Sequence, residues 1–253
     1  MPSPVVANGA ALLPSVAGAM PSRTVVVLDA IKHAILTGQM RPGQSLVETD
    51  LARMLGVSKT PVREALKTLA GAGLVTMSPY KGATVRTVDD ELVRSVYDLR
   101  LLLEPEAVRR AVTGAGTRAV PRNGSGTPAG GWDAARDALR RAEQATDRAD
   151  RSRANRGFHR ALYLGCGNAL LIRVLDDLRD QTALVSAAAW QHAPTWQAEA
   201  AEHDAILHAA SAGNADAASV LLTAHIQSFL ARNFPSLADT GADAGDTGDT
   251  HAS

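Results

Sequence analysis

Three histidines in the C-terminal half occupy positions where helical periodicity would direct them inward. His159 follows Asn155 by four residues, a spacing that places both side chains one turn apart on one helical face. His203 and His225 lie among apolar residues at the same helical spacing. A buried imidazole is costly unless it has a hydrogen-bond partner or shares an ion. The pattern therefore leaves two interpretations: three separately satisfied core histidines, or one divalent metal site with Asn155 as a fourth ligand.

A second set of candidate residues has the chemistry of a nucleic-acid contact. Hydroxyl groups stand at the start of an expected helix, where free backbone N–H groups also favour phosphate. Basic side chains follow on its outward face, and Arg63 can donate a bidentate pair of hydrogen bonds to a guanine edge. The residues expected to contact double-stranded DNA are Ser58, Lys59, Thr60, Arg63 and Lys67 on this helix, and Lys81 at the tip of the hairpin that follows.

The elements that would position these DNA contacts follow from apolar periodicity and from turn residues. A first helix is expected over 24–36 and a short second helix around Leu51, ended by Gly56 in a left-handed cap. A third helix follows at once, with Pro61 in its first turn. Strands are expected over 74–78 and 83–87. Three helices and a hairpin predict a winged helix-turn-helix over 23–88.

Beyond residue 88 the strand signals disappear, and the sequence predicts an all-α helical bundle over 89–235. Glycine, proline and polar residues interrupt it in a loop over 113–131. Residues 1–22 and 236–253 contain too little apolar pattern to fold and are expected to be a disordered leader and tail. The helices expected in the bundle cover 89–113, 133–149, 153–164, 169–189, 195–212 and 216–233.

Composition limits the class of protein and its compartment. Formal net charge is zero over the chain. Residues 23–88 nevertheless hold nine Lys or Arg against four Asp or Glu, an excess of five positive charges that favours a polyanionic partner. A single cysteine excludes an intramolecular disulfide framework, and no apolar stretch reaches the ~20 residues of a membrane span. A cytoplasmic protein without membrane contact is expected.

The motif around the second and third helices resembles the GntR family DNA-binding domain over nearly all of residues 24–88. This resemblance implies a homodimer that reads an inverted-repeat operator, with DNA contacts at Ser58, Lys59, Thr60 and Arg63 and further contacts at Thr49 and Lys81. Lys59 stands where the family commonly has arginine. The residues that carry the resemblance are Arg41-Pro42-Gly43, Glu48, Leu51-Ala52, Leu55-Gly56-Val57-Ser58-Lys59-Thr60-Pro61-Val62-Arg63-Glu64-Ala65-Leu66 and Gly73-Leu74-Val75.

Residues 91–232 are similar to the FCD ligand-binding domain of the FadR subfamily of GntR regulators. The residues that carry this similarity are Tyr97-Asp98-Leu99-Arg100, Leu103-Glu104, Asn155, His159, Gly167-Asn168, Glu202-His203, Ile206 and His225. The similarity implies a divalent metal, zinc or nickel, held by Asn155, His159, His203 and His225. Asn155 stands where the family frequently has aspartate.

A small carboxylate effector that meets the metal is also implied by the FCD similarity. Arg100 resembles the family arginine that pairs with the effector, and its alternative role is a surface or interhelix salt bridge. Arg179 and Gln181 are further candidates for the wall of the effector cavity, with no pattern to distinguish them from ordinary helix residues.

These features together predict a transcriptional regulator, more specifically a repressor, whose operator affinity responds to the effector. One alternative is a DNA-binding dimer whose bundle holds a vestigial site that senses nothing. The other is a zinc-dependent hydrolase, because three histidines around an open metal position also describe hydrolytic sites. The sequence lacks HExxH, a nucleophile elbow and a phosphate-binding glycine loop. We therefore expect no enzyme.

Overall fold

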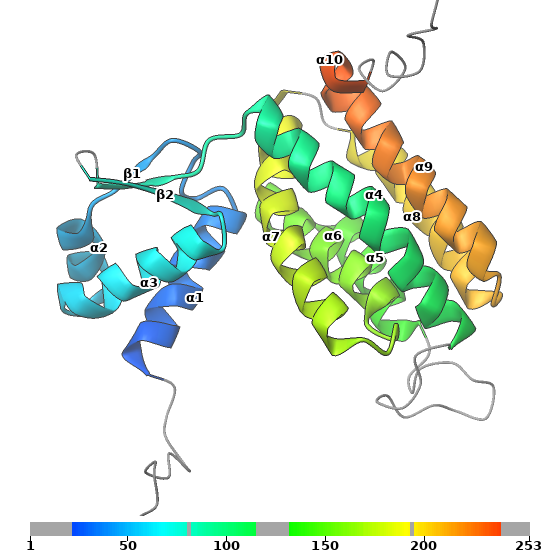
Figure 1. Cartoon of the computed structure of the whole chain (residues 1–253), viewed down its shortest axis with the longest axis horizontal. Helices are drawn as coiled ribbons and strands as arrows, with labels where there is room; N and C mark the ends of the chain where they lie inside the picture. The colour runs from blue at the N-terminus through cyan, green and yellow to red at the C-terminus, as the bar shows by residue number, and fades with distance from the viewer. Residues whose placement is uncertain (1–21, 80–81, 115–131, 193–194, 239–253) are drawn as a thin grey trace, which may run out of the picture.

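A computed structural model describes residues 22–79, 82–114, 132–192 and 195–238. Lys81, most of the expected 113–131 loop, residues 1–21 of the expected leader and residues 239–253 of the expected tail lie outside the described residues. Figure 1 shows two parts, a small one with a three-stranded sheet and a larger bundle of helices. None of the helices in the described ranges combines the length and apolar character that a membrane span requires.

The N-terminal part is a winged helix-turn-helix, as predicted. Its elements are α1 (Arg23–Leu36), β1 (Ser45–Leu46), α2 (Glu48–Leu55), α3 (Lys59–Gly71), β2 (Val75–Ser78) and β3 (Gly82–Val85). The strands form an antiparallel sheet in the order β1-β3-β2. The sequence predicted only the β2–β3 hairpin. β1 was missed because two residues are too short to carry an alternating pattern.

A tight turn joins α2 to α3 and sets the geometry of the motif. Gly56 ends α2 with φ 66°, in the left-handed region that glycine adopts without a steric penalty. Ser58, in an extended conformation, precedes the first residue of α3. Val62, Ala65, Leu66 and Leu69 form the buried stripe of α3, so the opposite side of the helix faces outward.

The larger part is all-α. Its helices are α4 (Asp90–Thr113), α5 (Asp133–Gln144), α6 (Arg148–Tyr163), α7 (Ala169–His192), α8 (Trp196–Ser211), α9 (Ala215–Asn233) and α10 (Pro235–Ala238). Two expectations were wrong. The predicted 133–149 helix ends at Gln144, because Asp147 caps a new helix by accepting a hydrogen bond from the Asp150 N–H. Residues 236–238, assigned to a disordered tail, form α10, whose Leu237 packs against the core.

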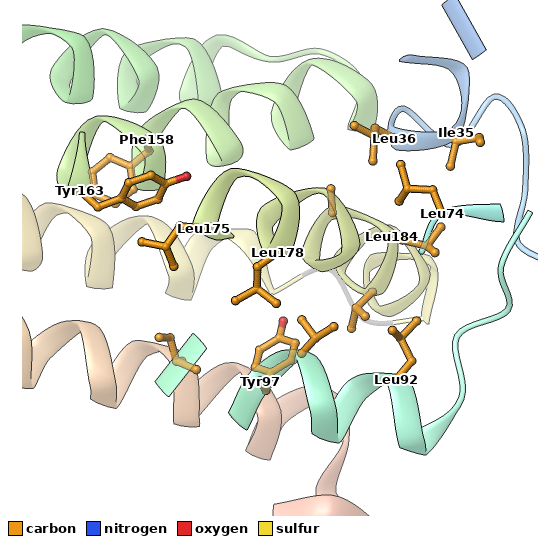
Figure 2. Close-up of a cluster of buried hydrophobic side chains, with 14 of the residues drawn as sticks. Ile35, Leu36, Leu74, Leu92, Tyr97, Phe158, Tyr163, Leu175, Leu178 and Leu184 are labelled. Carbon is orange, nitrogen blue, oxygen red and sulfur yellow. The ribbon is translucent and has the colours of Figure 1, made fainter. Parts of the chain in front are cut away.

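One cluster of buried hydrophobic side chains extends through both parts. Figure 2 shows Ile35, Leu36 and Leu74 of the winged part near Leu92 of α4 and Leu184 of α7. Because apolar burial is the main stabilising term in folding, the winged part is attached to the bundle by packing as well as by the connecting chain.

An ionic contact reinforces this packing. The Asp180 carboxylate on α7 is 1% exposed and forms ion pairs with Lys32 of α1 and Arg156 of α6. Burial raises the pKa of Asp180, against the opposing effects of Arg156 and Lys32. Gln181, the next residue of α7, packs closely against Gly73 of the winged part. A Cβ atom added to this glycine would lie 3.0 Å from Gln181 Cδ. Two adjacent residues of α7, Asp180 and Gln181, therefore contact the winged part at two separate places, Lys32 and Gly73.

We predict that Lys32→Met lowers the free energy of unfolding by about 1–3 kcal/mol, because the buried Asp180 carboxylate keeps only one of its cations. Urea denaturation of the full chain measures the change. Lys67→Met is the matched control, since Lys67 forms an exposed ion pair within α3, and it should change stability by no more than about 0.5 kcal/mol. Equal effects of the two substitutions would contradict the role given to Asp180.

Candidate metal centre and nucleic-acid interface

The three predicted histidines meet inside the bundle. His159 on α6, His203 on α8 and His225 on α9 are all buried, and one potential ligand atom from each lies within 4.8 Å of the others. His203 Nε2 and His225 Nε2 are 3.3 Å apart. Helical spacing placed each residue inward, and the packing of three helices brings them to one point.

The electrostatic surroundings leave these imidazoles neutral at pH 7. Burial lowers the pKa of His159 and of His203 well below the ordinary value, and neighbouring cationic groups lower it further. Burial also lowers the pKa of His225, although Glu202 opposes this shift. A neutral imidazole has a nitrogen lone pair available, which is the form that binds a metal ion.

Two carboxylates stand behind two of the rings. Glu202 Oε2 lies 2.7 Å from His225 Nδ1, and Glu104 Oε2 lies 3.2 Å from His159 Nδ1. Burial tends to raise the pKa of both carboxyls, but neighbouring Arg and His side chains bring that of Glu202 to about 2 and hold that of Glu104 well below its usual range. The N–H at His225 Nδ1, directed at Glu202, leaves the Nε2 lone pair of the same ring for a metal.

The donor set fits a divalent cation. Two nitrogens bound to a tetrahedral zinc ion at about 2.0–2.1 Å lie about 3.3 Å apart, and the His203–His225 separation is 3.3 Å. The Asn155 side-chain oxygen is buried and has no hydrogen-bond partner among the described residues. An orphaned carbonyl oxygen on the same face as His159 is the atom expected of a fourth ligand.

A cavity of about 260 Å³ adjoins this cluster. Asn155 and His203 form part of its wall, so the cavity reaches one of the three histidines and the candidate fourth ligand. Other lining residues are Leu139, Ala142, Glu143, Arg151, Ala154, Trp190, Trp196, Gln197, Glu199, Ala200 and Asp204. The volume lies just below the range of about 300–1,000 Å³ that is typical of small-molecule sites.

The residues predicted to contact the effector lie elsewhere. Arg100 is buried and donates from Nε to Glu104 Oε1 at 2.7 Å, so its salt bridge lies within one helix rather than on the surface or between helices. Arg179 Nη1 is 3.6 Å from the same oxygen. Gln181 faces Gly73 of the winged part. None of the three lines the cavity of about 260 Å³. Arg100 and Arg179 lie against Glu104, and Gln181 lies at the contact with the winged part.

The predicted DNA contacts are clustered on one face. Thr49 on α2, and Ser58, Lys59 and Thr60 at the start of α3, are exposed. Arg63 is also exposed, but its guanidinium is held by the Glu48 carboxylate, with Nη2 at 2.8 Å and Nε at 3.0 Å from it. Lys67 pairs with Glu64 at 3.0 Å. The face therefore contains two partly neutralised cations as well as Lys59, which forms no ion pair with any residue that the structure describes.

Sequence reasoning left several site residues without a role. Glu104 and Glu202 were recognised as motif positions only, although the four-residue spacing from Arg100 to Glu104 indicates a helical ion pair. Glu48 lies fifteen residues from Arg63, and no local signal predicts that pairing. Arg151 and Glu199 precede Asn155 and His203 by four residues, which would have placed each beside a predicted ligand.

Two family models match the chain. The model for bacterial regulatory proteins of the gntR family matches residues 23–85, and the model for the FCD domain matches residues 95–228. Together they cover the winged part and most of the bundle.

Similar proteins extend this result to most of the chain. A protein of Paenarthrobacter nicotinovorans named "Probable D-xylose utilization operon transcriptional repressor" is 30% identical over 212 residues, which are 83% of this chain and 89% of that protein. The regulator McbR of Escherichia coli K12 is 36% identical over 91 residues, 36% of this chain and 41% of that protein.

Solved structures agree in fold. E. coli McbR/YncC superposes with a TM-score of 0.71 at 23% identity, covering 86% of this chain and 99% of the other. A GntR transcriptional regulator from Rhodococcus sp. RHA1 gives 0.71 at 24% identity, covering 85% and 98%.

Proposed function

This chain belongs to the gntR family of bacterial regulatory proteins, in the FadR-like subfamily that carries an FCD domain, and from that premise we propose that it is a homodimeric, effector-controlled repressor. The relatives are transcriptional regulators, so the expectation that the chain is not an enzyme is confirmed. The proposed repressor acts in the cytoplasm on an inverted-repeat operator. It responds to a small organic acid bound beside a divalent metal ion.

The observation that carries the proposal is the convergence of three buried, neutral imidazoles, one of which, His203, lines a cavity together with Asn155. His159, His203 and His225, with Asn155, would hold the ion, which would supply an electrophilic centre for a carboxylate. Glu202 orients His225 by a hydrogen bond, and the Glu104 carboxylate lies 3.2 Å from His159 Nδ1. A site with a sensing role needs access to a ligand as well as to a metal, and the cavity supplies that access.

The carboxylate partner in this proposal is Arg179 rather than Arg100. Both guanidinium groups lie against Glu104, but only Arg100 donates hydrogen bonds to it. Arg179 Nη1 is 3.6 Å from Glu104 Oε1, and its Nε and Nη1 have no hydrogen-bond partners among the described residues. Burial and the nearby Arg100 lower the pKa of Arg179 to about 10, so the side chain stays charged at pH 7. Unsatisfied N–H groups of a buried cation are available to an anionic group that reaches the metal centre.

Coupling to DNA follows from the contacts between the two parts. Asp180, one residue beyond Arg179, pairs with Lys32 of the winged part and with Arg156, which is adjacent to Asn155. A ligand that shifts α6 or α7 therefore acts on a contact shared with α1. In the dimer this would alter how the two recognition helices match successive major grooves.

The proposal is tested by operator binding of the metal-loaded protein, on DNA recovered by selection from random sequence. Small carboxylates are the probes, together with D-xylose because of the relative named for its utilization. We expect one acid to change operator affinity by about 5–150-fold, the usual size of allosteric coupling. Metal and acid should strengthen each other's binding. If no probe changes operator affinity while the metal is bound, the bundle is a vestigial domain.

An apolar surface supports the dimer. Leu102 on α4 is 72% exposed and Leu170 on the neighbouring α7 is 61% exposed, with Leu99 and Val174 also exposed on these helices. Figure 1 shows α4 and α7 running side by side. Large apolar side chains gathered on one face of a monomer mark an interaction surface.

We predict that Leu102→Glu raises the dimer dissociation constant at least about 30-fold, because a twofold interface would bury the new charge twice at a cost of about 2–5 kcal/mol. Sedimentation equilibrium measures the constant. Val220→Glu on α9 is the control, since Val220 is 67% exposed on a different helix. Dissociation by the control but not by Leu102→Glu would move the interface to α9.

A further inference from the structure

The cavity beside the histidine cluster contains a buried carboxylate that forms no ion pair among the described residues, although Arg232, which pairs with Glu202, is close enough to act on it electrostatically. Glu199 on α8 is 3% exposed and lines the cavity. Its Oε1 accepts hydrogen bonds from Trp190 Nε1 at 3.0 Å and from Thr195 Oγ1 at 2.5 Å. Among the described residues, none donates to its Oε2 and none forms an ion pair with it. An isolated buried charge is costly, so this group calls for a positively charged or hydrogen-bonding partner.

Arg151, the one lysine or arginine among the described residues that line the cavity, does not serve this purpose. Arg151 donates to the Ala145 carbonyl oxygen at 2.8 Å, and its guanidinium lies over the Trp196 ring, 4.6 Å from the centroid. The remaining acidic lining residues, Glu143 and Asp204, are exposed. The wall therefore has a negative formal charge, which is unfavourable for a ligand that is only an anion.

Helical spacing relates Glu199 to the candidate metal centre. Glu199 precedes His203 by four residues on α8, so the two side chains lie one turn apart on the same face. A ligand that places an acid group at the His203 end of the cavity would hold its next few atoms near Glu199. The other lining residues near this path, Trp190, Trp196, Ala154 and Ala200, offer mostly apolar surface.

We propose that the ligand of this cavity is an amino acid with an apolar side chain, whose ammonium group pairs with Glu199 while its carboxylate faces the metal centre. The inference rests on the proposed sensing function and specifies its ligand. The chemistry is complementary at three points: a cation for the unpaired Glu199, an anion for the metal end, and apolar contact with the two indoles. The volume of about 260 Å³ suits a molecule of this size.

The test compares matched ligands on the full-length, zinc-loaded protein by calorimetry and by the fluorescence of Trp190 and Trp196. Leucine, methionine and phenylalanine are each compared with the acid that lacks the amino group and with the corresponding 2-hydroxy acid. We expect at least one amino acid to bind ~10-fold or more tightly than both of its analogues, equivalent to about 1.4 kcal/mol. Analogues that bind as tightly as every amino acid would overturn the inference.

Variants assign the preference to Glu199. Glu199→Gln keeps an acceptor for Trp190 and Thr195 and should reduce the amino-acid preference to about twofold or less. Glu91→Gln is the matched control, since Glu91 is an exposed carboxylate in the first turn of α4, as Glu199 is in the first turn of α8. If Glu199→Gln does not fold, the comparison of amino acids with their analogues on the unmodified chain still tests whether the cavity prefers an amino group.

The outcomes separate this inference from the proposed function. If a simple or hydroxylated acid binds and changes operator affinity without any amino-acid preference, the sensing function stands and the role of Glu199 is wrong. If no acid or amino acid binds, both are wrong. Retention of the full preference by Glu199→Gln would also overturn the inference.

Discussion

Replacing His203 by alanine is expected to weaken zinc binding by at least about 100-fold. Loss of a group that only orients a metal ligand typically costs 10–100-fold, and His203 is assigned as a ligand itself, with Nε2 at 3.3 Å from His225 Nε2. Titration against a competing chelator and the metal content of purified protein measure the change. Zinc should raise the melting temperature of the unmodified chain and leave that of the variant nearly unchanged.

His208→Ala is the matched control for this experiment, because His208 is exposed on the same helix. It should retain the zinc affinity of the unmodified chain. Asn155→Asp should raise that affinity, since a carboxylate stabilises a cation better than an amide oxygen does. If His203→Ala keeps its metal, the histidines are core residues that satisfy one another, and sensing must be sought elsewhere.

Arg63→Ala is expected to weaken specific operator binding by about 1–3 kcal/mol per half-site, the cost of losing a contact to a base. Its Nε and Nη2 are held by Glu48, so Nη1 remains for DNA and Glu48 becomes a positioning residue. Glu48→Gln should therefore lower specificity more than it lowers nonspecific affinity. Competition binding against operator and scrambled DNA at one fixed salt concentration measures both.

Arg53→Ala is the control for loss of charge, because Arg53 is an exposed cation of α2 that pairs only with Asp50 among the described residues. Lys67→Ala should cost less than Arg63→Ala, with a uniform loss across DNA sequences and a smaller salt dependence. If Arg63→Ala forms a folded dimer whose selectivity for the operator is unchanged, Arg63 does not read a base and serves only to link α3 to α2 through Glu48.

The local sequence pattern was sufficient to predict those parts of the fold that depend only on residues close together in the chain. Gly56 ends a helix because of its own backbone freedom, and the stripe from Val62 to Leu69 is periodic within one helix. His159 and Asn155 share a face for the same reason. The boundary at Asp147 was missed: aspartate is a helix-capping residue, but the alanine- and arginine-rich sequence around it continues the helical pattern.

Features that depend on how helices cross could not be predicted. The pairing of Arg63 with Glu48 requires the angle between α2 and α3, and the burial of Arg100 requires the neighbours that enclose α4. Glu199 illustrates the same limit. Its position at a helix start is readable, whereas its place in the cavity wall depends on Trp190 reaching it from α7.

The Asp180 contact bears on the engineering of biosensors from this chain. A designer who exchanges winged parts between regulators would naturally cut in the short linker before α4. Such a chimera would place a foreign α1 against Asp180, and any residue other than a lysine or arginine at position 32 would remove the interdomain partner of that buried carboxylate. Grafting should therefore transfer α1 together with its matching α7 residues, or introduce the cation into the incoming helix. The modular boundary of this regulator is a surface in three dimensions, not a point in the sequence.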